Sequence, residues 1–232
     1  MGEENNMEKE NIAEAKKMAI KHLPVLYFDK NEPFFPVMVG YTVFDKEGDS
    51  FSAPKKIELN RENRNKCIEY AFYYDYDIQH LYDLEHLWIY LDREEKVCGC
   101  EFSFHGMYLN AEIPGIDLLK GTSRVHMYVQ PGKHAFMPAP ELFALHTDFM
   151  EVCNKKAGAG GILCPDMLKE KFSFTKEEDL EVTEYIKKTY SFSPAQKYEE
   201  EKLSVELLMP WPELLRRIPE RMGEEKKKWF DN

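Results

Sequence analysis

Cationic character and long apolar runs are what this 232-residue sequence lacks. It has 31 Lys and Arg residues against 42 Asp and Glu residues, which gives a net charge of −11. Binding to a nucleic-acid backbone needs a cationic surface, so we expect no nucleic-acid partner. No apolar run approaches the ~20 residues that a membrane-spanning helix requires, and the acidic N-terminus carries no secretory signal pattern. We therefore expect a cytoplasmic protein without a transmembrane segment.

Cysteine is scarce as well, with five residues in the whole chain. Cys98 and Cys100 are separated by one residue, which is not the two-residue spacing of zinc knuckles and redox motifs. An odd number of scattered cysteines is typical of reduced thiols in a cytoplasmic chain. The glycine run at 157–161 is not a nucleotide loop, because no Gly-Lys-Ser/Thr follows it.

Aromatic residues are plentiful, with 15 Phe and 13 Tyr. Together with β-branched residues they form runs at 67–74, 83–91, 97–105 and 125–129, each bounded by turn residues. Short strands that do not alternate with helices predict an antiparallel sandwich or barrel. We therefore expect a mainly β fold, an antiparallel β-sandwich core with helical N- and C-terminal additions.

Three regions are predicted along the chain. Helical spacing of apolar residues predicts an N-terminal helix within 1–22, and the strand signals place the β-sandwich core and its site at 23–140. The remainder, 141–232, is expected to be a helical part packed on the core. Its predicted elements are a helix at 142–153, a capping box at 175–178 that opens a helix, a helix from 193, a returning strand at 203–207 and a last helix from 212.

Chemistry-bearing residues concentrate in the middle of the chain, where five of the seven histidines lie: His80, His86, His105, His126 and His134. If a strand begins near Asp83, then Asp83 and Glu85 project from the same face, about 7 Å apart by Cα. Uncompensated charge on an otherwise apolar face costs free energy, so a cation is the natural partner, and His80 can fold back onto it. The alternative is that both carboxylates face solvent or pair with Arg124 and lysines.

The ligand types restrict the metal. Imidazole with carboxylates suits Mn²⁺, Fe²⁺ or Zn²⁺, whereas mostly oxygen ligands with water suit Mg²⁺ or Ca²⁺. His105 and His126 stand on polar stripes of two further predicted strands, and a His that titrates near pH 7 can act as general base for a metal-bound water. They are the candidate catalytic residues. The alternative for each is a hydrogen-bonded structural histidine.

Several short motifs form an ordered series: Asp83-Leu84-Glu85-His86, then Ser103-Phe104-His105, then Gly132-Lys133-His134-Ala135. The series resembles the fungal vacuolar-sorting-like family, which has Asp-Trp-Glu-His, Ser-x-His and Gly-Ser-His-Ala at these places. More distantly, His80-x-x-Asp83-x-Glu85 is similar to the Gly-His-Arg-His-Asp-Trp-Glu heptapeptide of the necrosis- and ethylene-inducing peptide-like proteins. Leu84 and Lys133 depart from the first family's Trp and Ser. The resemblance spans roughly residues 22–137.

The resemblance implies a β-sandwich with a divalent-cation site. By the heptapeptide match, His80, Asp83 and Glu85 would line the cation, with Asp77 or Asp75 as an upstream acidic partner. The residues expected around these ligands, in a second layer, are Asp75, His86 and His134. The cation would be Mg²⁺, Mn²⁺, Ca²⁺ or Zn²⁺.

Three functions follow from such a site. The first is a metal-dependent hydrolase, in which the metal polarises a carbonyl or phosphoryl oxygen of a small-molecule or surface-displayed substrate. The second is a non-enzymatic module in which the cation bridges the protein to a glycan or a lipid head group, beside the tyrosines at 73–82. The third is a structural metal, with an interaction surface elsewhere.

Overall fold

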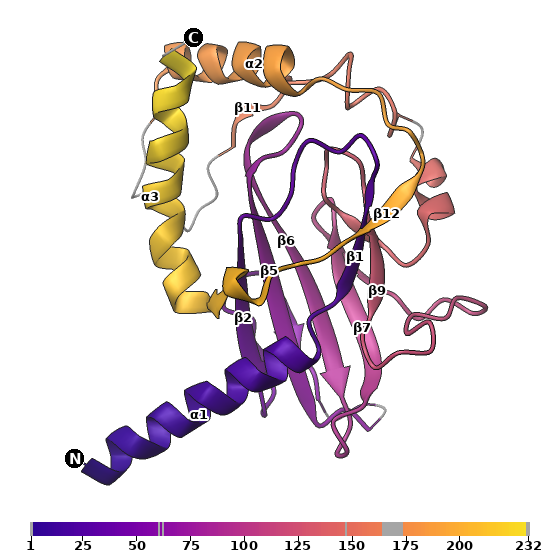
Figure 1. The fold of residues 1–232 in the computed structure, drawn as a ribbon, viewed down its shortest axis with the longest axis vertical. Helices are drawn as coiled ribbons and strands as arrows, with labels where there is room; N and C mark the ends of the chain where they lie inside the picture. Colours follow the sequence, from indigo (N-terminus) through magenta and orange to yellow (C-terminus); the bar gives the residue numbers. More distant parts are fainter. Residues whose placement is uncertain (1, 60, 62, 147, 164–173, 231–232) are drawn as a thin grey trace.

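In a computed structural model, the described residues form two main β-sheets and a separate two-stranded hairpin, β3 (Gly48–Asp49) with β4 (Lys56–Ile57), with helices around them (Figure 1). The structure describes residues 2–59, 61, 63–146, 148–163 and 174–230, with side chains from residue 11 to residue 228 of these ranges. Cys164 lies outside the described residues. The fold is mainly β, as the aromatic runs predict.

The larger sheet has the strand order β13-β2-β5-β6-β7-β8, and β11 pairs with β6 beside this path. Its strands are β2 (Met38–Phe44), β5 (Lys66–Tyr76), β6 (His80–Leu91), β7 (Val97–Phe104), β8 (Met107–Asn110), β11 (Gly161–Ile162) and β13 (Leu208–Pro210). The smaller sheet has the order β10-β9-β1-β12. Its strands are β1 (Val25–Asp29), β9 (His126–Val129), β10 (Phe136–Met137) and β12 (Tyr198–Glu201).

The sheets pack against each other through the aromatic residues that the strand patterns place inside. Phe72 of β5 meets Phe136 of β10 edge-on, with ring centroids 5.3 Å apart. Both sheets are mixed, because β1 pairs with β9, β13 with β2 and β11 with β6 in parallel. The expected antiparallel pairing is therefore joined by these three parallel pairs. Parallel pairs form where distant segments join an existing sheet edge, which local patterns do not reveal.

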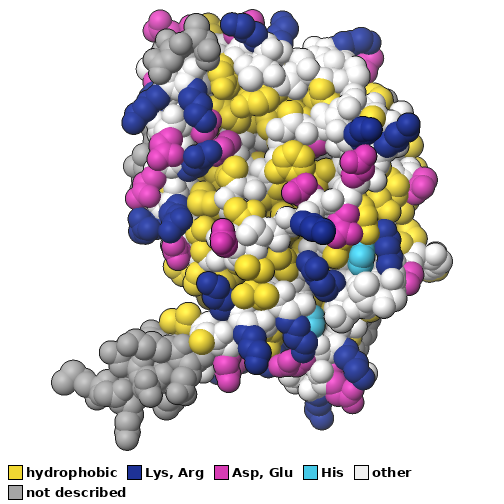
Figure 2. Space-filling view, viewed as in Figure 1, with side chains coloured by type: hydrophobic (Ala, Val, Ile, Leu, Met, Phe, Trp, Pro, Cys, Tyr) yellow, Lys and Arg dark blue, Asp and Glu magenta, His cyan; other side chains and the backbone are white. Residues whose placement is uncertain are grey.

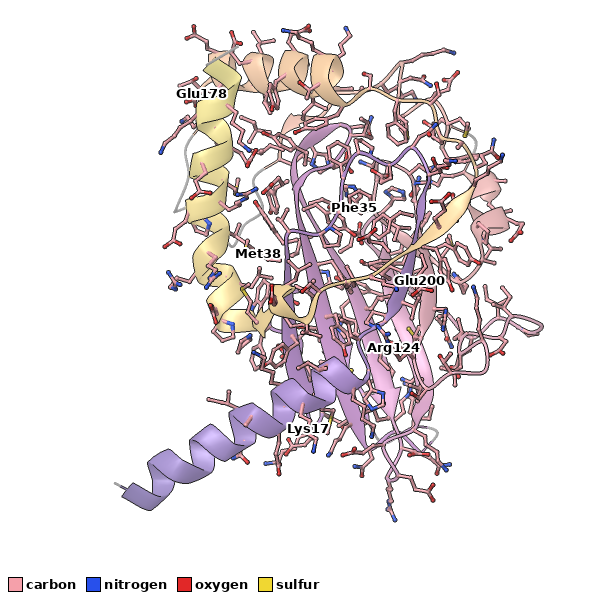
Figure 3. The ribbon with its side chains drawn as sticks, in the orientation of Figure 1. Lys17, Phe35, Met38, Arg124, Glu178 and Glu200 are labelled. Carbon is pink, nitrogen blue, oxygen red and sulfur yellow. The ribbon has the colours of Figure 1, made fainter. Side chains whose placement is uncertain are left out.

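Helices flank the sheets. Among the described residues they are α1 (Gly2–Lys21), α2 (Lys176–Tyr190), α3 (Trp211–Phe230) and two 3₁₀ segments, Pro140–Leu145 and Val205–Leu207. The first helix projects from the body, and α3 lies beside β2 (Figure 1). The predicted capping box is present, since the Thr175 hydroxyl accepts from the Glu178 N–H at 3.1 Å. In Figure 3, Glu178 lies where α2 approaches α3, and its carboxylate pairs with Lys226.

Three predicted C-terminal elements differ from the structure. In place of the helix expected at 142–153 there is a 3₁₀ helix, Pro140–Leu145, which is followed by the extended backbone of His146 and by turns over 148–153. No helix opens at 193, because the Asp29 carboxylate fixes a turn by accepting the N–H groups of Ala195 and Gln196 at 2.9 and 2.7 Å. The chain then pairs with β1 as β12. The strand expected at 203–207 is displaced to β13.

The face of the molecule seen in Figure 2 carries a mixed surface. Apolar side chains gather between α3 and β12 in the space-filling view, with charged groups of both signs around them (Figure 2). Phe35, labelled in this area in Figure 3, is 44% exposed. No helix among the described residues is both long and apolar enough to cross a membrane.

A gap in strand pairing along β6 positions the candidate site. β7 pairs with β6 as far as the match of Leu87 with Phe102, and β11 pairs with β6 at His80 and Leu81. Between these points, residues 82–86 form no strand ladder on that edge. A side chain takes the place of a strand partner for one backbone group here, since Leu84 N–H donates to the Asp83 carboxylate at 2.9 Å. The stretch 82–86 borders a cavity.

Candidate functional site

The cavity at this gap has a volume of about 490 Å³. All five residues of the unpaired stretch 82–86 line it. The remaining walls come from the loop before β4, the turn before β6, the hairpin of β7 and β8, and two later segments: Ser52, Ala53, Pro54, Asp77, His80, Ser103, His105, Gly106, Tyr108, Lys133 and Leu163. The cavity therefore gathers residues that are far apart in sequence around one short stretch of strand.

Asp83 and Glu85 lie on the inner face of β6, which faces the smaller sheet. Their neighbours on that face across β5 are Tyr74 and Phe72, and Leu87 continues the face into the main core. Glu85 is 8% exposed, and the Ser103 hydroxyl donates to its Oε2. Among the described residues, no Lys, Arg or His forms an ion pair with Glu85. Burial and the nearby negative charge of Asp83 raise the pKa of Glu85 well above 4.5.

Asp83 is compensated by His134. The Nδ1 atom of His134 lies 3.0 Å from Oδ2 of Asp83, and its Nε2 lies 3.8 Å from Oε1 of Glu32. Burial lowers the pKa of His134, but the two carboxylates outweigh burial and raise it to about 9. For Asp83, burial alone would raise the pKa. The hydrogen bond and the charge of His134 outweigh burial and bring the Asp83 pKa below 3.8. An imidazolium therefore joins the two sheets beneath the cavity.

The turn that carries His134 is fixed by a glycine. Gly132 has φ +67°, and a Cβ atom there would lie 2.8 Å from Cβ of Ile78. Its N–H donates to Oε2 of Glu32 at 2.8 Å, while its carbonyl accepts from Ile78 at 2.7 Å. The His134 ring stacks on the Tyr74 ring, with the ring centroids 3.9 Å apart. Glu32 is buried, and its pKa is raised by burial despite the contact with His134.

Asp77 lies at the cavity wall with both oxygens engaged. Lys133 Nζ is 2.6 Å from Oδ2, and the Gln79 N–H donates to Oδ1 at 2.6 Å. His80 Nδ1 donates to the Tyr82 carbonyl at 2.9 Å, which directs its Nε2 toward Asp77, 3.6 Å away. The metal-ligand role predicted for Asp77 is therefore not favoured by its partners. Asp77 and Lys133 form an ion pair without net charge next to Asp83 and Glu85.

The predicted catalytic histidines are separated by the fold. His105 lines the cavity, where its Nε2–H donates to Oε1 of Gln130 at 2.7 Å. His126 does not line the cavity. It lies on β9 of the other sheet, on the face opposite Met127, with Nδ1 3.0 Å from the Tyr27 hydroxyl and Nε2 3.1 Å from Thr122. Its predicted role at this site stays a prediction that its position does not favour.

The three residues expected around the ligands are also distributed differently. His134 contacts Asp83 directly, as described above. His86 lines the outer part of the cavity and stacks on Trp88, with ring centroids 5.4 Å apart. Asp75 points away from the cavity, because it forms a bidentate pair with Arg221 of α3 at 2.8 and 2.6 Å. Its expected role next to the cation is therefore not favoured.

The motifs of the sequence reveal only part of this network. Ser103 and His134 stand in the ordered motif series, but the pairing of Lys133 with Asp77 does not follow from it. Ser103 donates to Glu85, and Glu32, which does not line the cavity, contacts the His134 ring that pairs with Asp83. These residues meet through the stacking of the two sheets, so no local pattern places Glu32 next to His134.

The residues fit a cation only in part. Among the described residues, no group of three or more His, Cys, Asp or Glu side chains is arranged to hold a metal ion. Asp83 and Glu85 supply two carboxylates, and His80 is turned toward Asp77. Two carboxylates completed by water are the arrangement of a hard cation such as Mg²⁺, rather than of Zn²⁺ with several protein ligands.

Comparisons with known proteins add little. No model of a known protein family matches the chain, and no curated protein matches it either. Among solved structures, a match is necrosis and ethylene inducing protein 2 from the causal agent of cocoa's witches' broom disease, with 15% identity and a TM-score of 0.35. The alignment covers 61% of this chain and 81% of that chain. The fungal vacuolar-sorting-like family is not supported, and function must be argued from the site itself.

Proposed function

We propose that the cavity binds a divalent cation between Asp83 and Glu85. Glu85 carries the proposal, because its carboxyl is buried beside a second carboxylate and has no cationic partner among the described residues. A cation there would offset the burial and the repulsion from Asp83 that together raise the Glu85 pKa. Asp77 is already paired with Lys133 and Asp83 with His134. The carboxyl without a cationic partner is therefore Glu85, at the wall of the cavity.

Mg²⁺ is the first choice, with Mn²⁺ and Ca²⁺ as competitors. Hard cations with carboxylate and water ligands keep exchangeable positions, so the bound ion could also hold oxygen atoms of a ligand. The aromatic and polar walls, with Tyr108 and His105, would contact the rest of that ligand. The proposed activity is cation-dependent binding of an oxygen-rich small molecule, glycan or lipid head group. The cytoplasmic location predicted from the sequence belongs to this proposal.

A metal-dependent hydrolase is the second candidate, and His105 favours it. Its Nε2–H is donated to Gln130, so in the neutral ring Nδ1 is left as a proton acceptor at the cavity wall. Burial lowers the pKa of His105, which keeps the ring neutral near pH 7. The bound cation would supply an activated water. Under this alternative, His105→Ala abolishes cation-dependent turnover of ester or phosphoester substrates and leaves cation binding unchanged.

Thermal unfolding tests the cation site directly. Metal-free protein is heated with Mg²⁺, Mn²⁺ or Ca²⁺ added, beside the double variant Asp83→Asn/Glu85→Gln and the control Glu200→Gln, whose carboxylate on β12 is exposed (Figure 3). A cation at about 100 times its Kd stabilises by about 2.7 kcal/mol, roughly 5–10 °C for a chain of this size. We expect that shift in the parent and in the control, and none in the double variant. Equal shifts in all three proteins, or none in the parent, contradict the proposal.

A further inference from the structure

A hairpin on the opposite, outer face of the larger sheet is attached in an unusual way. It comprises β3 (Gly48–Asp49), β4 (Lys56–Ile57) and the loop 50–55 between them, and we call residues 48–57 the flap. In the part of the chain that the structure describes, β3 and β4 pair only with each other. An isolated two-stranded hairpin is at best marginally stable. The flap is therefore held in place by side chains rather than by a strand ladder.

The first attachment is a buried carboxylate. Glu69 of β5 is 1% exposed and accepts hydrogen bonds from the hydroxyls of Ser50 and Ser52 and from Nε1 of Trp88, the last two at 2.7 Å each. Two of its three donors belong to the flap. The carboxylate thus holds the loop 50–55 against β5.

The second attachment is an ion pair at the other end of the same loop. Lys55 Nζ is 2.5 Å from Oε2 of Glu101 and lies over the rings of Trp88 and Tyr108, at 5.2 and 5.7 Å from their centroids. Together the two carboxylates hold the loop at both ends.

A small apolar cluster lies beneath the flap, separate from the main core. It contains Phe44, Ile57, Leu59, Cys67, Trp88 and Tyr90. Cys67 and Trp88 are both 0% exposed. Because this cluster does not merge with the core between the sheets, it can open without disturbing that core.

The flap is also a wall of the cavity. Ser52, Ala53 and Pro54 line it, next to His86. The His86 Nε2 atom is buried and has no hydrogen-bond partner in the closed arrangement. Buried polar atoms are nearly always hydrogen-bonded, so closure of the flap leaves one group unsatisfied that opening would release to water or to a ligand. The hydrogen bonds and the ion pair of the flap favour the closed arrangement, whereas the unsatisfied Nε2 atom of His86 favours opening.

We propose that the flap is a lid that opens as a unit while the two sheets stay folded. Opening uncovers the indole of Trp88, which contacts Tyr108 of the cavity at 5.3 Å, and so extends the cavity with an aromatic floor beside His86. The enlarged site takes a ligand with a ring that stacks on Trp88 and an O–H or N–H group that donates to Nε2 of His86. The lid depends on the cavity wall and not on the identity or presence of a cation.

Native cysteines provide the test. Cys67 lies beneath the flap, whereas Cys100 and Cys153 belong to the main core, and all three are 0% exposed. The unmodified protein is incubated with iodoacetamide under native conditions, and labelling of each cysteine is followed by peptide mass spectrometry. Each rate is divided by the rate in denaturant, which removes differences in intrinsic reactivity. We expect Cys67 to react at least tenfold faster than Cys100 and Cys153. Equal normalised rates for all three overturn the lid.

Glu69→Gln sharpens the test. The amide keeps the shape of the side chain but has one oxygen for the three donors, so the flap is held less tightly. We expect a further several-fold increase at Cys67 with no increase at Cys100, and no change in either with Glu200→Gln. An equal increase at both cysteines means that Glu69 acts on global stability, which contradicts a local lid. The labelling of the unmodified protein decides the question if Glu69→Gln does not fold.

Discussion

The two faces of the larger sheet carry two sets of buried or partly buried carboxylates with opposite surroundings. On the outer face, Glu69 accepts from two hydroxyls and an indole, and Glu101 is paired with Lys55 and with Arg64 at 3.0 Å. On the inner face, Asp83 is paired with His134, but Glu85 has a hydroxyl as its donor and a carboxylate as its neighbour.

This difference separates structural from functional carboxylates. Glu69 has three hydrogen-bond donors, and the pKa of Glu101, although burial raises it, ends below 4.5 because of Lys55. The charged form of Glu85 is opposed by its environment, and its pKa moves in the other direction. Perturbed carboxyls in a cavity are candidates for function. The same residue type therefore holds the flap on one face, and on the other face it carries the cation site that we propose.

Removing a compensated outer carboxylate has the largest expected effect. Glu101→Ala leaves the charges of Lys55 and Arg64, whose side chains are 12% and 5% exposed, without this carboxylate. Breaking a buried pair from one side costs about 3 kcal/mol. We expect a loss of that size in the free energy of unfolding, measured in urea. A loss below about 1 kcal/mol would show that Glu101 is not a structural anchor, since that is the range of an exposed pair.

The His134 imidazolium predicts a pH dependence. The pKa of His134 is about 9 in the folded protein, against 6.5 for a histidine that is free of such contacts, as in the unfolded chain. The folded state therefore holds this proton more tightly, and the stabilisation is fully present below pH 6.5 and is lost as the pH rises through 9. The shift corresponds to about 3 kcal/mol. Urea unfolding of the parent should show this loss between pH 6 and pH 10.

The matched variant for that measurement is His134→Gln, which cannot become charged. Its free energy of unfolding should be lower at pH 6 and should change less between pH 6 and pH 10 than that of the parent. Parallel pH profiles for the two proteins contradict the raised pKa of His134.

Neutralising one carboxylate on each face should have effects of opposite sign. Because the pKa of Glu85 is raised, its charge destabilises the folded state at pH 8, and Glu85→Gln should stabilise by about 1 kcal/mol. Glu69→Gln should destabilise by about 1–2 kcal/mol, because donors lose their acceptor. Urea unfolding of both at pH 8 in the absence of divalent cations compares them. The same sign for both variants removes the distinction between the faces.

The smallest effect is expected at His126. It lies on the smaller sheet with Tyr27 and Thr122 as partners and does not line the cavity. His126→Ala should leave the cation-induced thermal shift unchanged within error, with a stability loss of about 1 kcal/mol from its hydrogen bonds. A lost shift would place His126 in the site against its position in the fold.

Local patterns predicted what depends on neighbours in sequence. The alternation that places Asp83, Glu85 and Leu87 on one face, the β-rich middle of the chain and the capping box of α2 are of this kind. The partners of the site were not predictable, since His134 meets Asp83 across 51 positions of sequence. Pro194 favoured a helix start, but pairing of the following segment with β1 overrode it. Which partner pairs with each charged side chain therefore depends on tertiary contacts, which local patterns do not reveal.

A calorimetric titration of metal-free protein with Mn²⁺ or Mg²⁺, using Glu85→Gln and Glu69→Gln side by side, tests the central claim most directly. Both variants remove one buried carboxylate charge from the same sheet, one from each face. The account predicts one cation per chain in the parent and in Glu69→Gln, and loss of that binding in Glu85→Gln. Retained binding in Glu85→Gln, or equal loss in both variants, would contradict a cation site on the inner face.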